Sequence, residues 1–359
     1  MNTTASRTST THPRPIPYRS GTALHPTPLG STRTDTSFEL DTAEKLAGLA
    51  ELIDSGESFD GKTITLTGNI DLKGHTLNLS DYYDGTIFGG TFDGNGKTIS
   101  GFKSTNNYYD GLFEYVDGAT IKNLTLKGEG AGAGLIFYAR DVTVENCTID
   151  LDQTISGSGI SGAVVGHAAG NGTFKNITTK GTVNFTRETS SYTNFGSIIG
   201  QKYAGAVVTI EGCVNEINIT ARTTGLGLGG FVGALTYDAT GSCTITDCVN
   251  NGNITLEAGA TGNVGGIVGG NHDCDLDITN CTNNGDITAV SADVFTGGIL
   301  GMKNNDAADG WVTITGCTNN GSYHRRLCKP DIHRQVFGHK GHHHQLHRIR
   351  LSEPALIHF

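Results

Sequence analysis

The sequence predicts an all-β fold, a parallel β-helix in which each repeat forms one coil of a solenoid, with a short α-helix as its N-terminal cap. Two repeated motifs and one charge pattern predict this architecture. The first motif is an apolar pair between glycines, and the second is a threonine-rich strand. Single units of this kind cannot bury their apolar faces alone, so the repeats are expected to stack.

The apolar motif framed by glycines, called the glycine motif below, recurs five times. Its closing glycines lie 34, 33, 36 and 32 residues apart. A period in this range is typical of solenoids and related arrays. The copies are residues 162–166, 196–200, 229–233, 265–269 and 297–301.

A five-residue strand motif recurs from residue 120 onward. Its second position is always Ile, Val or Phe, so an apolar side chain faces the core while its neighbours point outward. Its fourth position is only Asn, Gly or Asp, which tolerate a left-handed backbone, so a bend is predicted there in every unit. The copies are residues 120–124, 143–147, 173–177, 209–213, 244–248, 277–281 and 313–317.

The third position of the strand motif alternates in charge along the chain. It is occupied by Lys122, Glu145, Lys175 and Glu211, and then by threonine in the last three copies. In a parallel stack in register, equivalent side chains lie about 4.8 Å apart, and like charges there would repel. The alternation therefore favours parallel coils over an antiparallel meander.

Residues 37–119 are predicted to form the helical cap and the first coils. Asp41 and Glu44 have the spacing of a capping box, and Gly56 follows the predicted helix. Residues 93–96, Asp-Gly-Asn-Gly, predict a tight turn between two strands. The apolar stripe of the helix comprises Leu46, Leu49, Ala50 and Ile53.

The charge is distributed unevenly along the chain. Residues 37–321 hold 14 Lys and Arg against 32 Asp and Glu, a net charge of −18. Such an acidic body argues against nucleic acid as a partner, and no apolar run is long enough for a membrane span. Residues 1–36 and the basic, His-rich residues 322–359 lack the repeat pattern. We expect residues 1–36, without a signal peptide, to be disordered or mispredicted, and residues 322–359 to be disordered or out of frame. Residues 120–321 are expected to form the regular repeats.

The repeats resemble a known family. The Gly265–Gly269 segment, followed by the strand and turn of residues 277–288, is similar to the GLUG-motif repeat of bacterial cell-surface and secreted proteins. Residues 92–102 with the preceding helix resemble the module that often precedes such repeats. The resemblance covers roughly residues 37–321. It implies a right-handed parallel β-helix, exported to the cell envelope or beyond, often in adhesin-like proteins, and it supplies no catalytic motif.

A paired-tyrosine motif near the start of the solenoid is the candidate ligand-binding site. Residues Tyr82, Tyr83 and Asp84 precede one glycine, and Tyr108, Tyr109 and Asp110 precede another. Each tyrosine offers an apolar face and a polar tip, so a pair can stack on a sugar while the acid binds hydroxyls. The alternative is that these side chains pack between the cap and the first coils.

Five cysteines occupy the fifth position of the strand motif. A disulfide or metal ladder is one interpretation, and a buried stack of small hydrophobic side chains is the other. Leu124 and Ile177 take the same position, which favours the buried stack. Cys243 and Cys274 lie outside this column and could form a disulfide in an exported protein. The column comprises Cys147, Cys213, Cys248, Cys281 and Cys317.

No cofactor or metal site is predicted. Asp273, Asp275 and Asp277 alternate as calcium ligands might, but the EF-hand glycine and terminal glutamate are missing. The histidines at 339–347 could bind metal, but their segment departs from the repeats. The Thr-x-Thr pairs at 244–246 and 313–315 resemble the flat threonine arrays of ice-binding solenoids. However, Asp277 interrupts the array, and threonine is common in strands.

These features predict a non-catalytic, exported repeat module that serves as an adhesin-like spacer or as a surface that binds extracellular glycans or host or matrix proteins. The alternative is a polysaccharide lyase or hydrolase on a parallel β-helix. Coil spacing can place two carboxylates at the separation that glycoside hydrolysis uses. However, no equivalent acids occupy adjacent coils of the strand motif, and no catalytic motif is present.

Overall fold

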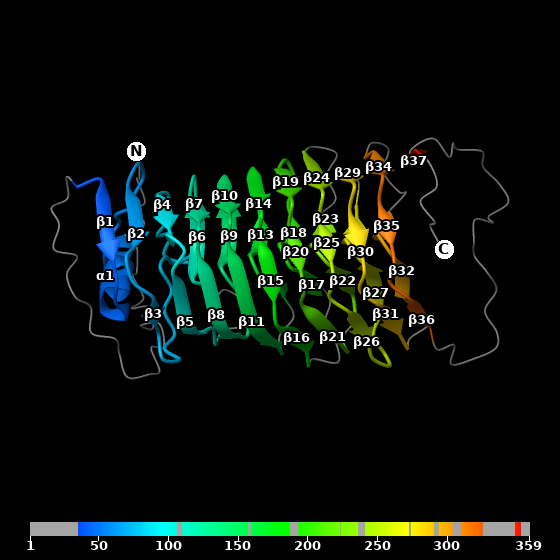
Figure 1. The fold of residues 1–359 in the computed structure, drawn as a ribbon, viewed down its shortest axis with the longest axis horizontal. Helices are drawn as coiled ribbons and strands as arrows, with labels where there is room; N and C mark the ends of the chain where they lie inside the picture. Colours follow the sequence, from blue (N-terminus) through cyan, green and yellow to red (C-terminus); the bar gives the residue numbers. More distant parts are fainter. Residues whose placement is uncertain are drawn as a thin grey trace, which may run out of the picture.

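The chain folds into one long parallel β-solenoid, as predicted from the sequence (Figure 1). The computed structural model describes residues 35–105, 110–156, 159–186, 193–222, 224–235, 241–272, 274–290, 294–303, 310–325 and 349–352. Within these ranges, neighbouring strands of each sheet pair in parallel and belong to successive coils. The predicted fold class, a parallel β-helix with one short helix, is confirmed.

Four sheets form the walls of the solenoid over the described residues. The 11-stranded sheet contains β1 (Ser37–Leu40), β2 (Thr63–Leu66), β4 (Thr91–Asp93), β7 (Thr120–Lys122), β10 (Val142–Glu145), β14 (Gly172–Lys175), β19 (Val207–Glu211), β24 (Ser242–Thr246), β29 (Asp275–Thr279), β34 (Val312–Thr315) and β37 (Ile349–Ser352). The five-stranded sheet contains β12 (Ile160–Gly162), β17 (Thr193–Gly196), β22 (Leu226–Gly229), β27 (Gly262–Gly265) and β32 (Val294–Gly297). The seven-stranded sheet contains β6 (Phe113–Asp117), β9 (Ile136–Arg140), β13 (Val165–Ala168), β18 (Ile199–Lys202), β23 (Val232–Leu235), β28 (Val268–Asn271) and β33 (Leu300–Lys303).

The fourth sheet has 14 strands and runs along the remaining wall. It contains β3 (Ile70–Asp71), β5 (Thr98–Lys103), β8 (Thr125–Gly130), β11 (Thr148–Ile155), β15 (Thr178–Lys180), β16 (Thr182–Phe185), β20 (Val214–Asn215), β21 (Asn218–Ala221), β25 (Val249–Asn250), β26 (Ile254–Leu256), β30 (Thr282–Asn283), β31 (Ile287–Ala289), β35 (Thr318–Asn319) and β36 (Tyr323–Arg325). The predicted division at residue 321 falls between β35 and β36, which pair with β30 and β31.

The helix α1 (Ala43–Asp54) lies with β1 at the N-terminal end of the stack (Figure 1). Its predicted apolar stripe is buried, because all four side chains join the main core. The predicted capping box is wrong in its details. The N-cap is Thr42, whose side chain accepts a hydrogen bond from the Lys45 N–H. Asp41 instead forms an ion pair with Lys45, with 2.8 Å between Oδ1 and Nζ.

The bends and the register of the strand motif match the prediction. All seven residues at its fourth position have positive φ, from 52° at Asn176 to 65° at Gly316. In the third position, Glu145 pairs with Lys122 on one side and Lys175 on the other. Lys175 also pairs with Glu211, at 2.7 Å between Nζ and Oε2. The exposed charges therefore alternate along the wall as the sequence pattern requires.

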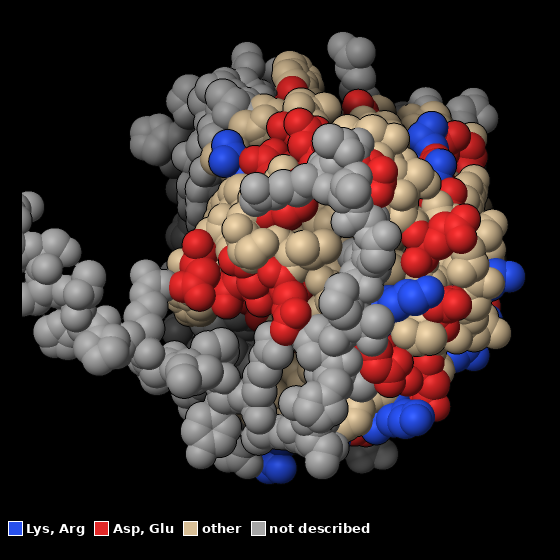
Figure 2. All heavy atoms as spheres, turned by 90° about the vertical axis from the view of Figure 1, so that its left-hand side faces the viewer, with Lys and Arg blue, Asp and Glu red and all other residues tan. Residues whose placement is uncertain are grey.

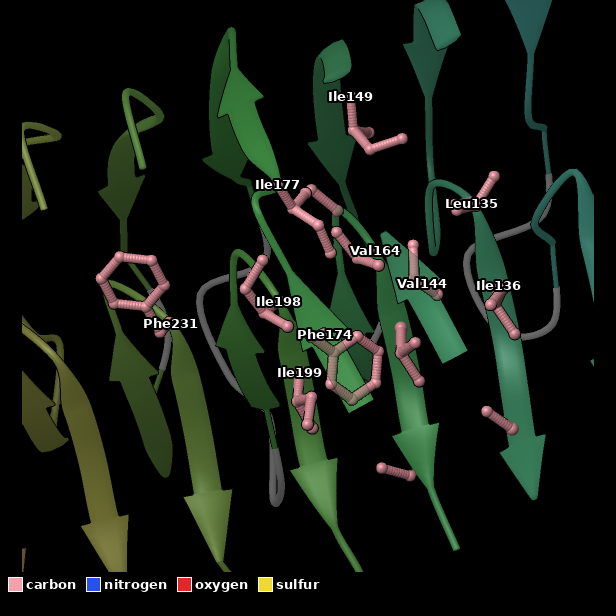
Figure 3. Close-up of a cluster of buried hydrophobic side chains, with 14 of the residues drawn as sticks. Leu135, Ile136, Val144, Ile149, Val164, Phe174, Ile177, Ile198, Ile199 and Phe231 are labelled. Atoms are coloured by element: carbon pink, nitrogen blue, oxygen red, sulfur yellow. The ribbon is translucent and has the colours of Figure 1, made fainter. Parts of the chain in front are cut away.

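The interior is one continuous hydrophobic core with a buried polar ladder inside it. Figure 3 shows side chains of successive coils, among them Val164, Ile198 and Phe231, gathered in this core. Each amide of the ladder donates from Nδ2 to Oδ1 of the next, at 2.7 Å in every step. These bonds satisfy buried amides that would otherwise be costly to desolvate. The ladder comprises Asn215, Asn250, Asn283 and Asn319.

Candidate functional site

The first paired-tyrosine motif forms a turn on the outside of the first coils. Asp81 shapes this turn, because its Oδ1 accepts hydrogen bonds from the backbone N–H groups of Tyr83 at 2.7 Å and Asp84 at 2.9 Å. The backbones of Asp81 and Thr86 form an antiparallel bridge across it, and Gly85 adopts φ 71°. A short side-chain acceptor and a glycine are the usual means of fixing such a turn.

The two tyrosines of this turn have different surroundings. The Tyr83 side chain is 59% exposed, and Asp84 beside it is also exposed. The Tyr82 ring is half-buried against other aromatic rings, with centroid distances of 4.9 Å to Tyr138 and 5.5 Å to Phe137. Tyr83 and Asp84 therefore present the accessible part of the motif, while Tyr82 packs on the rings of Phe137 and Tyr138 in β9.

The second paired-tyrosine motif is described only in part. Tyr108 and Tyr109 lie outside the described residues. Asp110 is 6% exposed, and its carboxylate accepts hydrogen bonds from the Asn78 Nδ2 at 3.3 Å and the Thr105 N–H at 2.7 Å. The Asp110 carboxylate therefore links the segment that contains Asn78 to the segment that contains Thr105.

Glu114 ties the tyrosine turn to the solenoid wall. Its Oε1 accepts a hydrogen bond from the Asn78 side-chain amide, and its Oε2 accepts one from the Tyr82 N–H at 3.3 Å. The side chain is 9% exposed. Burial raises the pKa of Glu114 to about 7, against the opposing effect of these two hydrogen bonds. Glu114 and Asp110 thus share the amide of Asn78 beneath the turn.

Below the turn, aromatic side chains follow one outer face of the seven-stranded sheet. Tyr115 on β6, Tyr138 on β9 and His167 on β13 are in register. The Tyr203 ring continues the series, stacked on His167 at 5.5 Å with 20° between the planes. We call Tyr82 and these four residues the aromatic row. The His167 ring stacks between Tyr138 and Tyr203, whereas the Tyr115 and Tyr138 rings meet edge to face, and all five residues are half-buried.

Burial shifts the pKa values of three residues in the aromatic row, His167, Tyr138 and Tyr203. The pKa of His167 is lowered to about 4 by desolvation, so the imidazole is neutral at ordinary pH. Its Nδ1 lies 2.8 Å from the Tyr203 hydroxyl oxygen, within hydrogen-bond distance. Desolvation also raises the pKa values of Tyr138 and Tyr203. His167, Tyr138 and Tyr203 are therefore uncharged at neutral pH.

Sequence reasoning missed the row but could have found part of it. His167 immediately follows the closing glycine of the first glycine motif, and Gln201 follows the second at the same register position. Tyr138 pairs with His167, although its coil lacks the glycine that makes the motif visible. The position after the closing glycine therefore marked an outward column, but only pairing across coils showed which rings meet.

The cysteine column is buried in the core, and its described thiols are free. Burial raises the pKa of Cys147 to about 11, so this thiol remains protonated and packs as a small hydrophobic group. Cys243 and Cys274 are also buried and free in this structure.

The candidate metal ligands do not converge among the residues that the structure describes, where no group of three or more His, Cys, Asp or Glu could hold an ion. Asp275 and Asp277 are exposed on β29, while Asp273 and the histidines at 339–347 lie outside the described residues. Oδ1 of Asp275 accepts a hydrogen bond from the Trp311 N–H at 2.9 Å.

Charge on the N-terminal end of the solenoid is mainly negative. Figure 2 views this end and shows groups of Asp and Glu between scattered Lys and Arg. The tyrosine turn adds Asp81 and Asp84 near the same end of the stack. None of the described helices is long and apolar enough to cross a membrane.

Comparisons with known proteins identify the fold but no family. No protein-family model matches the chain, so the resemblance to GLUG-motif repeats stays a prediction. The chain is 27% identical to halomucin of Haloquadratum walsbyi over 191 residues. This match covers 53% of this chain and 2% of halomucin.

Two solved structures are similar to the chain. A Bacteroides ovatus protein described as a candidate immunoglobulin A1 protease is 18% identical, with a TM-score of 0.49, and the match covers 84% of this chain and 87% of that one. An IgA1 protease structure is 16% identical with a TM-score of 0.50, and the match covers 85% of this chain and 26% of that one. At 16% identity, the similarity to the IgA1 protease structure shows the fold alone.

Proposed function

We propose that this chain is a non-catalytic, exported repeat module that acts as a rigid spacer and binds carbohydrate at the tyrosine turn. The observation that carries the binding role is the exposed Tyr83 ring beside the exposed Asp84, held on a turn that Asp81 and Glu114 fix to the solenoid. An aromatic face next to an acid is suited to the apolar face and the hydroxyls of a sugar. Because the turn is already fixed, little conformational entropy is lost on binding.

The continuous core and register support the spacer role. Paired strands, the asparagine ladder and the alternating charges repeat through consecutive coils. Each coil therefore contacts its neighbours in the same way, and the stack extends along one axis. Export is supported by the sequence resemblance to repeats of cell-surface and secreted proteins. Extracellular glycans are the proposed partners, with host or matrix proteins as the other class to test.

A polysaccharide lyase or hydrolase is the second candidate. The observation that favours it is the raised pKa of Glu114, which shares the Asn78 amide with Asp110, because a carboxyl that stays protonated near neutral pH can act as a general acid. However, both oxygens of each carboxyl already accept hydrogen bonds from the protein itself. This internal use favours a structural role for both acids.

One experiment separates these functions. The full chain is passed over immobilised plant, bacterial and mucin glycans and over matrix proteins, and retention and product formation are measured together. We expect retention on a glycan without product, and about tenfold weaker binding of Tyr83→Ala, corresponding to about 1.4 kcal/mol. Phe295→Ala is the matched control, because Phe295 is 65% exposed on β32, several coils away.

Other outcomes have defined meanings. Reducing ends or unsaturated products that disappear in Glu114→Gln would establish the enzyme and overturn the non-catalytic proposal. Equal loss of retention in Tyr83→Ala and Phe295→Ala would reject the tyrosine turn as the binding site. Retention by no ligand would leave the spacer role alone.

A further inference from the structure

Three tyrosine rings from separate segments meet at the end of the aromatic row beside the tyrosine turn. The Tyr82 ring comes from the turn, Tyr115 from β6 and Tyr138 from β9. Their centroids lie 4.9 Å apart for Tyr82 and Tyr138, 5.4 Å for Tyr115 and Tyr138, and 5.7 Å for Tyr82 and Tyr115. All three residues are half-buried.

This contact has a defined oxidative chemistry. Loss of one electron and one proton turns a tyrosine phenol into a phenoxyl radical, whose unpaired electron is shared with the ring carbons ortho to the hydroxyl-bearing carbon. Two such radicals in contact form a carbon–carbon bond, and the two ring hydrogens at that bond move to the phenol oxygens. The overall change joins two tyrosines, and one hydrogen peroxide is reduced to two waters.

We propose that Tyr82 and Tyr138 form an oxidative cross-linking site that produces an intramolecular dityrosine. Their rings are the nearest pair and are tilted by 44°. The Tyr115 and Tyr138 rings are nearly perpendicular, at 88°, and both belong to strands in fixed register. Tyr82 instead belongs to a turn outside the paired strands. Its backbone is held by Glu114, but rotation of its side chain toward Tyr138 breaks no strand pairing.

The cross-link would fasten the turn to the second coil of the aromatic row. Glu114 already holds the turn by a hydrogen bond to the Tyr82 N–H, so the link would make an existing contact covalent. The described cysteines are free and buried, whereas these tyrosines are half-buried. The oxidant class required is hydrogen peroxide acting through a haem peroxidase, which attacks accessible phenols.

The test treats the full chain with a haem peroxidase and limiting hydrogen peroxide. Dityrosine fluorescence is followed, the monomer is isolated by size exclusion, and the linked peptides are sequenced by mass spectrometry. We expect a monomeric product that joins the Tyr82 peptide to the Tyr138 peptide. Tyr138→Phe should lose most of the monomer fluorescence while retaining its melting temperature, because the ring still packs.

Tyr203→Phe is the matched control. Tyr203 lies in the same row but stacks on His167, so its removal should leave the dityrosine yield unchanged. A link mapped to any other pair, unchanged fluorescence in Tyr138→Phe, or dityrosine found solely in dimers would overturn the proposal. Absence of dityrosine in the treated wild-type chain would also overturn it.

Discussion

The stability of the coils beneath the tyrosine turn should depend on pH through two groups that act in opposite directions. Burial raises the pKa of Glu114 from 4.5 to about 7 and lowers the pKa of His167 from 6.5 to about 4. The folded protein therefore prefers protonated Glu114 and neutral His167. Each shift corresponds to about 3 kcal/mol between the two ends of its titration.

The signs follow from which state binds the proton more tightly. For Glu114 the folded state does, so its contribution to stability is fully present below pH 4.5 and is lost as the pH rises through 7. For His167 the unfolded state does, so its contribution is present above pH 6.5 and is lost as the pH falls toward 4. Between pH 4.5 and 6.5 the two contributions offset one another in the wild-type chain.

Single substitutions should separate the pH dependence of stability due to Glu114 from that due to His167. Glu114→Gln mimics the protonated acid, and His167→Gln installs the residue that the next coil carries at Gln201. We expect the unfolding free energy of wild type minus that of Glu114→Gln to rise by about 3 kcal/mol as the pH falls from 7 to 4.5. The corresponding difference for His167→Gln should fall by about 3 kcal/mol from pH 6.5 to 4.

Urea unfolding followed by circular dichroism across this pH range measures both differences. The matched control is Glu216→Gln, because Glu216 forms an exposed ion pair with Lys180 and should show little change. A Glu114→Gln curve parallel to that of the wild type at every pH would refute the assignment of the raised pKa. A direct titration of the Glu114 carboxyl by NMR with a midpoint near 4.5 would refute it independently.

Three further predictions concern the repeat, each measured by urea unfolding. Asn250→Ala should lower the free energy of unfolding by about 3 kcal/mol, because it leaves the amides of Asn215 and Asn283 without their 2.7 Å hydrogen-bond partners. Asn280 has φ 55°, so Asn280→Val should lower the free energy of unfolding by about 1–2 kcal/mol, while Asn280→Gly should leave it nearly unchanged. Equal losses in the two variants would contradict the left-handed bend. Gly265→Ala should prevent correct folding, because its Cβ would lie 1.9 Å from the Val268 oxygen, whereas Gly96→Ala meets nothing within 4 Å and should still fold.

The sequence was sufficient for the architecture because each repeated position has a local physical requirement. The left-handed bend at Asn280 needs a residue that tolerates positive φ, and Gly212 satisfies the same need in an earlier coil. The alternation of Lys122, Glu145 and Lys175 predicted the observed register, because like charges one coil apart would repel. The N-cap was misjudged, because Asp41 and Thr42 are both acceptable caps by type and backbone geometry selects Thr42.

The candidate site was only partly predictable. The tyrosine pair at 82 and 83 was visible as a motif, but the motif does not show that Tyr83 is exposed while Tyr82 packs on Tyr138. That difference depends on Glu114, which holds the Tyr82 N–H from another strand. Glu114 has no sequence signal of its own, because its raised pKa arises from burial in the assembled coils.

The sequence by itself determined the repeat, the parallel direction, the bends and the buried cysteine column, because these features recur in successive repeats and each copy has the same local requirement. Only the tertiary structure decided which side chains from different coils share a surface. Tyr115, Tyr138, His167 and Tyr203 come together because stacking brings residues distant in the chain within a few ångströms. Ring contacts, burial and shifted pKa values depend on that stacking, so no single repeat contains the information that creates them.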